Sequence, residues 1–462
     1  MLHMHSCKNL SILIIFLATV SASTFSCKKY VDPGTPVNGL TVDKVYTDSL
    51  STLGVVLYLY SGSPTNSVNG GNLILNMCQY GAMSADDGYY FNNATYDPYR
   101  TNTLNGNLGN VTYTIPYQVI NVANSAIAGI SGTSFPASYK NQLLGECKFW
   151  RAYAYFLLVN YFGDVPLITT ADPNANTSKP RTPADQVYTQ IVADLKDAES
   201  LLSPNYPSPE RARVNKWAAS ALLARVYLYQ KNWSAAASEA SAVIGSGSYH
   251  LETDPNNVFI KSSNETIWQI ISNVSAGITG VTRMGRSWLP PSTTPVFVLY
   301  DTLAKTFETG DLRKDNWTRP LSYNGSTYYY PYKYKIRNTG ASGNEYSVML
   351  RLAEQYLIRS EARAMQNDIP GARADLDTVR IRAGLPPTTA ATQPDLLLAL
   401  EKERWTELFT EMSDRWFDLK RTGRIDAVLS LSKPQWQSYQ ALYPIPTTEI
   451  TSNPNLSQNK GY

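Results

Sequence analysis

Histidine is scarce in this chain of 462 residues: the sequence contains three, and His3 and His5 lie within its first five positions. A zinc site made of several histidines is therefore excluded, and a catalytic triad would depend on His250 alone. Because His250 follows a glycine-rich stretch, "GSGSYH", we expect it to have a structural role. The sequence also has no nucleophile elbow, zinc motif or phosphate-binding loop, which argues against a hydrolase, and we predict no metal and no cofactor.

An excess of charge is missing as well. Lysine and arginine total 40 against 37 acidic residues, which gives a net charge of +3, and charged residues make up 17% of the chain. Binding to nucleic acid needs a basic surface, so we predict no nucleic-acid partner. After residue 26, no stretch approaches the roughly 18 consecutive apolar residues of a membrane span.

One apolar run does occur, at the N-terminus. Leu10–Val20 follows Lys8 and leads into small residues, which is the pattern of a secretory signal and too short for a membrane span. The run ends shortly before Cys27 in "TFSCKKYVD". Either the chain is cut before Cys27, which then carries acyl chains as in bacterial lipoproteins, or an ordinary cut leaves a free or disulfide-bonded thiol.

We favour lipidation of Cys27, although Thr24 stands where lipoprotein signals usually have leucine. Two or more acyl chains hold a protein stably at a membrane. We therefore predict a signal peptide at residues 1–26, a lipid anchor with a polar tether at 27–39, and one domain at 40–462. Within that domain Cys78 and Cys147 either form a disulfide or act as two buried small hydrophobic residues, and we favour the second interpretation.

Helical periodicity begins near residue 141. Apolar residues recur every three or four positions from Asn141 to Phe162, and again from Pro183 to Leu202, where Thr182 is a plausible cap. The stretches at 215–245 and 356–384 each predict two helices joined by a short turn. Small residues stand where the paired helices would touch, as in tetratricopeptide units, at Ala224 and Ala236 and at Ser360 and Ala372.

The clearest amphipathic pattern is the last one, at 399–423. It predicts one helix with Trp405, Leu408, Phe409, Met412, Trp416 and Leu419 on a single stripe. Charged residues three or four apart accompany the stripe and predict ion pairs on a solvated or interhelical face: Arg404 with Glu407, Glu411 with Arg415, and Asp418 with Arg421.

Long regions between these helices are rich in Gly, Asn, Ser, Thr and Tyr, at about 61–140, 246–348 and 428–462. Such long irregular segments usually carry function or short strands. We predict a mainly α fold: a tetratricopeptide-like helical superhelix, chiefly 141–245 and 348–427, with a loop-rich ligand-binding part containing short strands, chiefly 61–140 and 246–347.

Several stretches together resemble the SusD/RagB family of bacterial outer-membrane nutrient-binding lipoproteins. They run in the family's order from residue 141 to the C-terminus: "CKFWRAYAYFLLVNYFGDVPLI", "NKWAASALLARVYLYQKNWSAAASEASAVI", "TGDLRK", "RLAEQYLIRSEARA" with "VRIRAGLP", "ERWTELFTEMSDRWFDLKRTG" and "YPIPTTEITSNPNLSQNKGY". The resemblance covers residues 40–140 poorly.

The resemblance implies a non-catalytic protein, held by lipid at the outer membrane and facing outward. It would capture oligosaccharide or peptide and pass it to a TonB-dependent transporter of the SusC type. Two alternatives stay open: a secreted, lipid-anchored glycoside hydrolase, because two carboxylates suffice for that chemistry, and a pure protein scaffold.

Sugar recognition combines flat aromatic faces with a few placed polar groups. Among the 32 tyrosines, three clusters stand out: "ADDGYYFNNATYDPYR" at 85–100, "TRMGRSWLPPS" at 282–292 and "SYNGSTYYYPYKYK" at 322–335. In the third, alternating tyrosines from 328 to 334 also fit one face of a strand, and Trp288 could simply pack on the proline pair. We predict ligand contacts from Asp87, Tyr89, Tyr90, Asn92, Tyr96, Arg286 and Trp288, with Tyr89, Tyr90, Tyr96 and Trp288 as a stacking platform.

Overall fold

The computed structural model describes residues 42–61, 70–108, 110–271, 273–275, 278–338 and 343–462, so the signal segment, Cys27 and the tether up to residue 39 lie outside the described residues. Two compact units divide the chain, Met1–Ser51 and Thr52–Tyr462. The first unit contains helix α3, Val42–Val45, and the start of α4. Within the described ranges, every helix falls short of the length or the apolar character needed to cross a bilayer.

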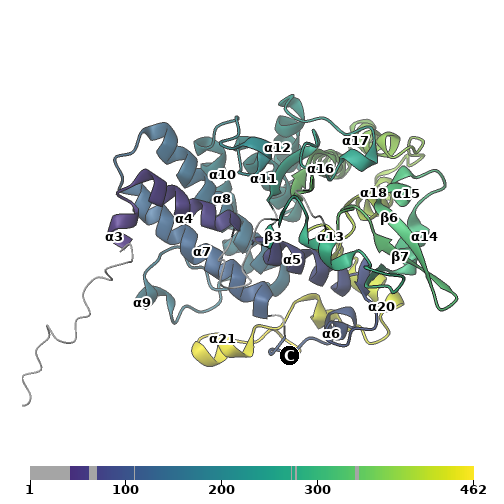
Figure 1. Ribbon diagram of the computed structural model, residues 1–462, viewed down its shortest axis with the longest axis horizontal. Coiled ribbons are helices and arrows are strands. Elements are labelled where there is room, and N and C mark those ends of the chain that lie inside the picture. The colour runs from purple at the N-terminus through teal and green to yellow at the C-terminus, as the bar shows by residue number, and fades with distance from the viewer. Residues whose placement is uncertain (1–41, 62–69, 109, 272, 276–277, 339–342) are drawn as a thin grey trace, which may run out of the picture. The chain divides into compact units, whose positions relative to one another are not determined.

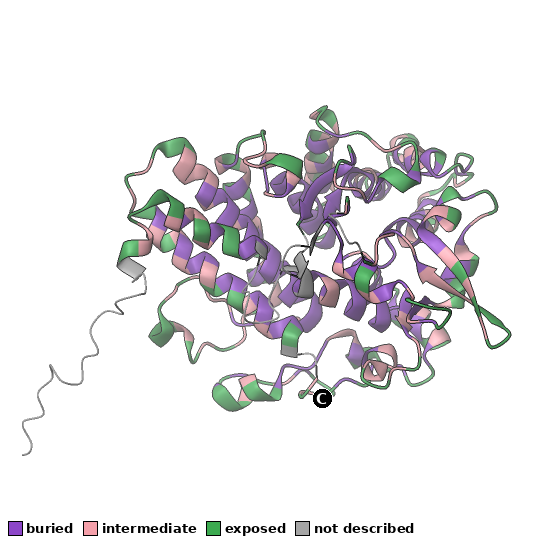
Figure 2. Ribbon diagram, viewed as in Figure 1, coloured by how far each residue is buried: buried purple, intermediate pink, exposed green. Residues whose placement is uncertain are grey.

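Helices dominate the second unit (Figure 1). The longer ones are α4 (Ser49–Ser61), α5 (Gly70–Ser84), α7 (Asn110–Ser131), α8 (Ala137–Phe162), α10 (Ala184–Leu201), α11 (Lys216–Tyr229), α12 (Trp233–Gly245), α16 (Leu352–Met365), α17 (Ile369–Arg382), α18 (Gln393–Leu408), α19 (Asp414–Arg421) and α20 (Ile425–Ser432). Most pack on their neighbours in chain order, from α7 through α8, α10, α11 and α12 to α16, which also contacts α17 and α18. Buried residues line the sides on which these helices meet (Figure 2), and the predicted mainly α, superhelical fold is confirmed.

Both predicted helical hairpins are present. The α11–α12 hairpin buries Ala224 and Ala236 completely, because the two helices touch at these small residues. The α16–α17 hairpin does the same with Ser360 and Ala372, and the Ser360 hydroxyl donates to the Ala372 carbonyl at 2.6 Å. The α10 helix is also present, but Thr182 is not its cap: its backbone pairs with Val165 instead.

The prediction of irregular structure across 61–140 is wrong for two segments. Helices α5 and α7 occupy 70–84 and 110–131, although α7 contains an internal Pro116 and many β-branched and Asn residues. These residue types have low helix propensity, so the sequence alone argues against the helix. Packing overrides that preference, because α7 buries Ile120, Ala123 and Ala126 completely and lies along α8.

The single helix predicted at 399–423 is also wrong. Helix α18 ends at Leu408 and α19 begins at Asp414, and between them Thr410, Met412 and Ser413 have positive φ angles of 58°, 39° and 65°. Tertiary contacts hold this unusual turn: the Thr410 N–H donates to Asp87 Oδ2 at 2.8 Å, and the Ser413 hydroxyl donates to the Met77 carbonyl.

The charged residues of 399–423 are mostly buried, and most of their ion-pair partners lie far away in the sequence. Asp418 and Arg421 form the predicted pair, but Arg404 binds Asp418 and Arg415 binds Asp86, so the other two predicted pairs are wrong. Glu407, which has no exposed side-chain surface, accepts hydrogen bonds from three arginines: Arg313, Arg351 and Arg382. These guanidinium charges hold the pKa of Glu407 below its ordinary value despite its burial.

The described residues in the rest of the unit form short helices and four two-stranded antiparallel sheets, β1–β5, β2–β8, β3–β4 and β6–β7. The short helices are α6 (Asp97–Arg100), α9 (Pro173–Asn176), α13 (Arg283–Trp288), α14 (Asp301–Thr306), α15 (Leu312–Trp317) and α21 (Thr447–Ser452), and 3-10 turns lie at Pro209–Arg211, Pro255–Asn257 and Ser438–Ala441. The strands are β1 (Gly88–Tyr90), β2 (Thr266–Ile270), β3 (Asn273–Ser275), β4 (Ile278–Thr279), β5 (Phe297–Leu299), β6 (Thr318–Tyr323), β7 (Ser326–Pro331) and β8 (Ser347–Arg351). The predicted tyrosine strand is thus β7, which ends before Tyr332.

Cys78 and Cys147 are separate buried thiols, which confirms their interpretation as small hydrophobic residues. Burial raises the pKa of the Cys78 thiol to about 12, and its sulfur lies 3.7 Å from the sulfur of Met412. His250 is exposed, and its backbone N–H donates to the Asn264 carbonyl at 3.2 Å.

Candidate functional site

Two short strands bring together the three aromatic clusters of the sequence. Strand β1 pairs antiparallel with β5, so that Tyr90 lies opposite Phe297 and Tyr89 opposite Val298. Gly88 allows the close approach, because a Cβ at this position would lie 2.6 Å from the Phe297 ring. The first cluster thus meets the short segment that follows the second one.

A row of four rings links the first two clusters. Tyr96 stacks on Tyr90 with centroids 4.3 Å apart and planes at 21°. Tyr90 meets Phe297 edge to face at 5.1 Å, and Phe297 stacks on Trp288 at 4.9 Å and 23°. Tyr90 and Trp288 are 9% and 3% exposed, so they support the row from inside, whereas Tyr96 keeps part of its surface. Trp288 therefore packs on Phe297 and belongs to the same row as Tyr90 and Tyr96.

Tyr89 and Phe91 extend this arrangement to the third cluster. Tyr89 contacts Tyr300 with centroids 4.9 Å apart, and the Arg100 guanidinium lies 5.4 Å from its ring. Phe91 meets Tyr323 and Tyr328 of the β6–β7 hairpin edge to face, at 5.7 and 5.0 Å. All of these side chains are half-buried. We use the term aromatic surface for Tyr89, Phe91, Tyr96, Tyr300, Tyr323 and Tyr328.

The polar residues predicted for the site fall into two groups. Asn92 and Arg286 are exposed, and Asn92 has a positive φ of 49° beside the aromatic surface. Asp87 is 2% exposed, and its two oxygens accept hydrogen bonds from the Trp405 indole and the Thr410 N–H, both at 2.8 Å. Burial raises the pKa of Asp87 to about 7. In this structure Asp87 ties the start of β1 to the turn after α18.

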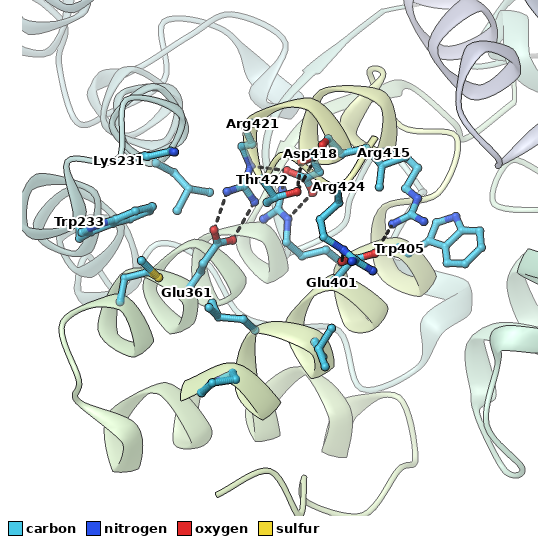
Figure 3. Close-up of a pocket in the computed structure, with 17 residues that line it drawn as sticks. Lys231, Trp233, Glu361, Glu401, Trp405, Arg415, Asp418, Arg421, Thr422 and Arg424 are labelled. Carbon is cyan, nitrogen blue, oxygen red and sulfur yellow. Dashed lines mark hydrogen bonds and ion pairs between the residues drawn. The ribbon is translucent and has the colours of Figure 1, made fainter. Parts of the chain in front are cut away.

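A separate pocket lies among the helices, and no predicted site residue lines it. Its volume is about 490 Å³, and α11, α12, α16, α18 and α19 contribute most of its lining (Figure 3). Trp233, Met365, Leu397 and Leu398 supply apolar surface, and Arg415 lies 4.1 Å above the Trp405 ring.

Several charged residues of this pocket pair with one another. Glu361 and Arg421 point toward each other in Figure 3 and form two hydrogen bonds at 2.6 and 2.7 Å, and Glu401 pairs with Arg424 at 2.9 Å. The sequence does not predict the pocket, because its lining residues come from five helices and each has the pattern of an ordinary amphipathic helix face. Among the described residues, no group of His, Cys, Asp or Glu side chains is placed to hold a metal ion.

Comparison with known proteins agrees with this architecture. Residues 63–228 match a family described as starch-binding and associating with the outer membrane, and residues 264–462 match the SusD family. The chain belongs to the SusD/RagB family. Membership of SusD/RagB supports carbohydrate binding as the general function of the chain and association with the outer membrane as its setting.

Some relatives of the SusD type match nearly the whole chain, and others match a part of it. SusD-like protein P25 of Formosa agariphila is 24% identical over 97% of this chain and 99% of its own length. The starch-binding protein SusD of Bacteroides thetaiotaomicron is 32% identical over 25% of this chain and 21% of its own. Among solved structures, a laminarin-binding SusD-like protein superimposes with a TM-score of 0.75, at 25% identity over 90% of this chain and 98% of that one.

Proposed function

We propose that this chain is a non-catalytic binding protein that captures oligosaccharide at the aromatic surface. The convergence of three separate aromatic clusters on strands β1 and β5 carries the proposal. Half-exposed tyrosine rings offer the flat faces that stack on sugars, and Asn92 and Arg286 offer polar groups beside them. The laminarin-binding and starch-binding relatives support a glycan as the ligand.

The predicted platform separates into contact and support residues. Tyr89 and Tyr96 would contact the ligand, while Tyr90 and Trp288 would hold the row in place from inside. Each lost ring contact is worth about 1 kcal/mol, or roughly fivefold in affinity. A Tyr89→Ala, Tyr96→Ala variant should therefore bind a glycan identified on an array about 25-fold more weakly by calorimetry.

Tyr439→Ala is the matched control for this experiment. Tyr439 is 40% exposed and packs edge to face on Tyr462, so the variant loses a comparable ring that lies outside the aromatic surface. Its affinity should match that of the unmodified chain. Equal affinity in the double variant would contradict the assignment of Tyr89 and Tyr96, and peptide binding without glycan binding would redirect the function to peptide capture.

The carboxylates around the site support a non-catalytic role over the hydrolase alternative. A glycoside hydrolase needs two carboxyl groups that face the sugar. Here Asp86 is bound by Arg415 and Asp87 by Trp405 and Thr410, both deep in the fold, and Asp97 pairs with Arg100 at 2.9 Å. Incubation of the pure protein with a bound glycan should give no products by chromatography, and turnover would favour the hydrolase.

Family membership also supports delivery to a TonB-dependent transporter of the SusC type, with Cys27 as the lipid anchor and the domain on the outer face of the outer membrane. We expect the chain to co-purify with such a barrel from membranes. A Cys27→Ala variant should lose its membrane anchor and keep glycan affinity. If this variant still fractionates with the outer membrane when the barrel is absent, the lipidation proposal fails.

A further inference from the structure

The basic residues of the loop-rich part are distributed unlike those of the helical scaffold. Residues 281–344 contain nine lysine and arginine residues against four acidic ones, a net charge of +5 in a chain whose total is +3. The segment also supplies half of the aromatic surface, namely Tyr300, Tyr323 and Tyr328. An excess of one charge at a binding surface favours ligands of the opposite charge.

Where the loop-rich part meets the scaffold, arginines are neutralised by carboxylates. Arg313 binds Asp311, Glu403 and Glu407, and Arg351 binds Glu265, Glu407 and Glu411, all as buried ion pairs. These charges serve the fold and are not available to a ligand.

Arg286 and Arg319 are different. Arg286 is exposed on α13, two residues before Trp288, and its side chain forms no ion pair with any residue in the described part of the chain. Burial lowers the pKa of Arg283, which lies on the same helix, and the positive charge of Arg286 lowers it further. Two like charges therefore lie close together on α13.

Arg319 lies on the face of the hairpin that carries aromatic-surface tyrosines. In the β6–β7 register Arg319 pairs with Tyr330 and Leu321 pairs with Tyr328, and alternate positions of a strand share a face. The Arg319 guanidinium lies 4.8 Å from the Tyr332 ring and donates to the Asp315 carbonyl, but it has no carboxylate partner within the described ranges. Lys335 lies 5.6 Å from the same ring, which places a second cation beside it.

We propose that the ligand is an anionic glycan, whose carboxylate or sulfate groups are bound by Arg286 and Arg319 while its sugar rings stack on the aromatic surface. This inference rests on the proposed function. Guanidinium groups bind such anions in a bidentate manner, and neither Arg286 nor Arg319 has a carboxylate partner among the described residues, so their charges stay available.

Calorimetry with three defined glycans tests the inference: polygalacturonate oligosaccharides carry carboxylates, carrageenan oligosaccharides carry sulfates, and laminarin carries no charge. We expect at least one of the anionic glycans to bind about tenfold more tightly than laminarin, and its affinity to fall as salt rises. Arg286→Gln and Arg319→Gln should each weaken that binding about tenfold, and Arg319→Gln should leave laminarin affinity unchanged.

Lys196→Gln is the matched control, because it removes one exposed positive charge from the scaffold helix α10 and should not change anionic-glycan affinity. Laminarin binding as tight as that of both anionic glycans, or unchanged affinities in the two arginine variants, would overturn the inference and leave glycan capture standing. Absence of binding to every glycan of a broad array would contradict the proposed function itself.

Discussion

Replacement of Glu407 by glutamine tests the buried ion network that joins the loop-rich part to the helical scaffold. Glu407 Oε1 accepts from Arg351 and Arg382, and Oε2 accepts from Arg313 at 2.8 Å. Glutamine has the same shape but only one oxygen, so its NH₂ group would face arginine donors whichever way the amide turns. The substitution therefore removes one negative charge and places the amide NH₂ donor against an arginine N–H donor.

Removing one partner of a buried pair costs about 3–5 kcal/mol. Each arginine keeps another carboxylate, since Arg313 retains Asp311 and Arg382 retains Glu265, so we expect a loss near the lower end, about 3 kcal/mol. The free energy of unfolding is measured by urea titration with tryptophan fluorescence. Because the folded-state pKa of Glu407 is lowered, its contribution is present above pH 4.5, and the difference between the two proteins should shrink as the pH falls below that value.

Asp301→Asn is the control for this measurement. It makes the same change from carboxylate to amide, in a pair with Lys305 whose side chains are 76% and 79% exposed. Exposed pairs contribute little, so the loss should stay within about 1 kcal/mol. A loss of the same small size in Glu407→Gln would refute the view that the network holds the two parts of the fold together.

Three further predictions concern packing, an ion pair and the buried thiols. Gly81→Ala would place a Cβ 2.2 Å from the Ser413 hydroxyl and should lower the free energy of unfolding by about 1–3 kcal/mol. Gly54→Ala is the control: it has open space around it and should raise the free energy of unfolding slightly. Equal shifts in the melting temperature of the two variants would contradict this packing. The hydrogen bonds from Arg380 lower the pKa of the Glu308 carboxyl to about 2, so carbon-13 NMR should show this carboxyl still ionised below pH 4.5. Arg380→Gln should raise the pKa of Glu308, and an unchanged titration in this variant would refute the pairing. Peptides containing Cys78 and Cys147 should resist a thiol reagent in the native protein and react after denaturation, as read by mass spectrometry; rapid native labelling would contradict their burial.

The sequence was sufficient for the parts of the fold that depend on local pattern. The helical hairpins α11–α12 and α16–α17 combine small residues at the contact with short polar turns, and both features lie within about 30 residues of each other. Helix α7 was not predictable in this way, because its low-propensity residues become helical only through packing against α8. The break at Thr410–Ser413 depends on Asp87 and Met77, which lie more than 300 residues away in the sequence.

The candidate site shows the same division. Composition identified the aromatic clusters around Tyr89, Trp288 and Tyr328, since tyrosine and tryptophan in polar loops are unusual enough to notice. Their convergence through Phe297 and Phe91 was not visible, because a ring contact between residues more than 200 positions apart leaves no trace in a single sequence. Asp87 looked like a ligand contact and is instead an internal hydrogen-bond acceptor, because exposure cannot be read from residue type.

A crystal structure of the protein with a bound glycan tests the central claim most directly, since it shows where the sugar lies. We predict electron density for sugar rings on the aromatic surface, in contact with Tyr89 and Tyr96 and within hydrogen-bond distance of Asn92 or Arg286. Density confined to the pocket lined by Trp233, Glu361 and Arg421, with the aromatic surface empty, would contradict the account.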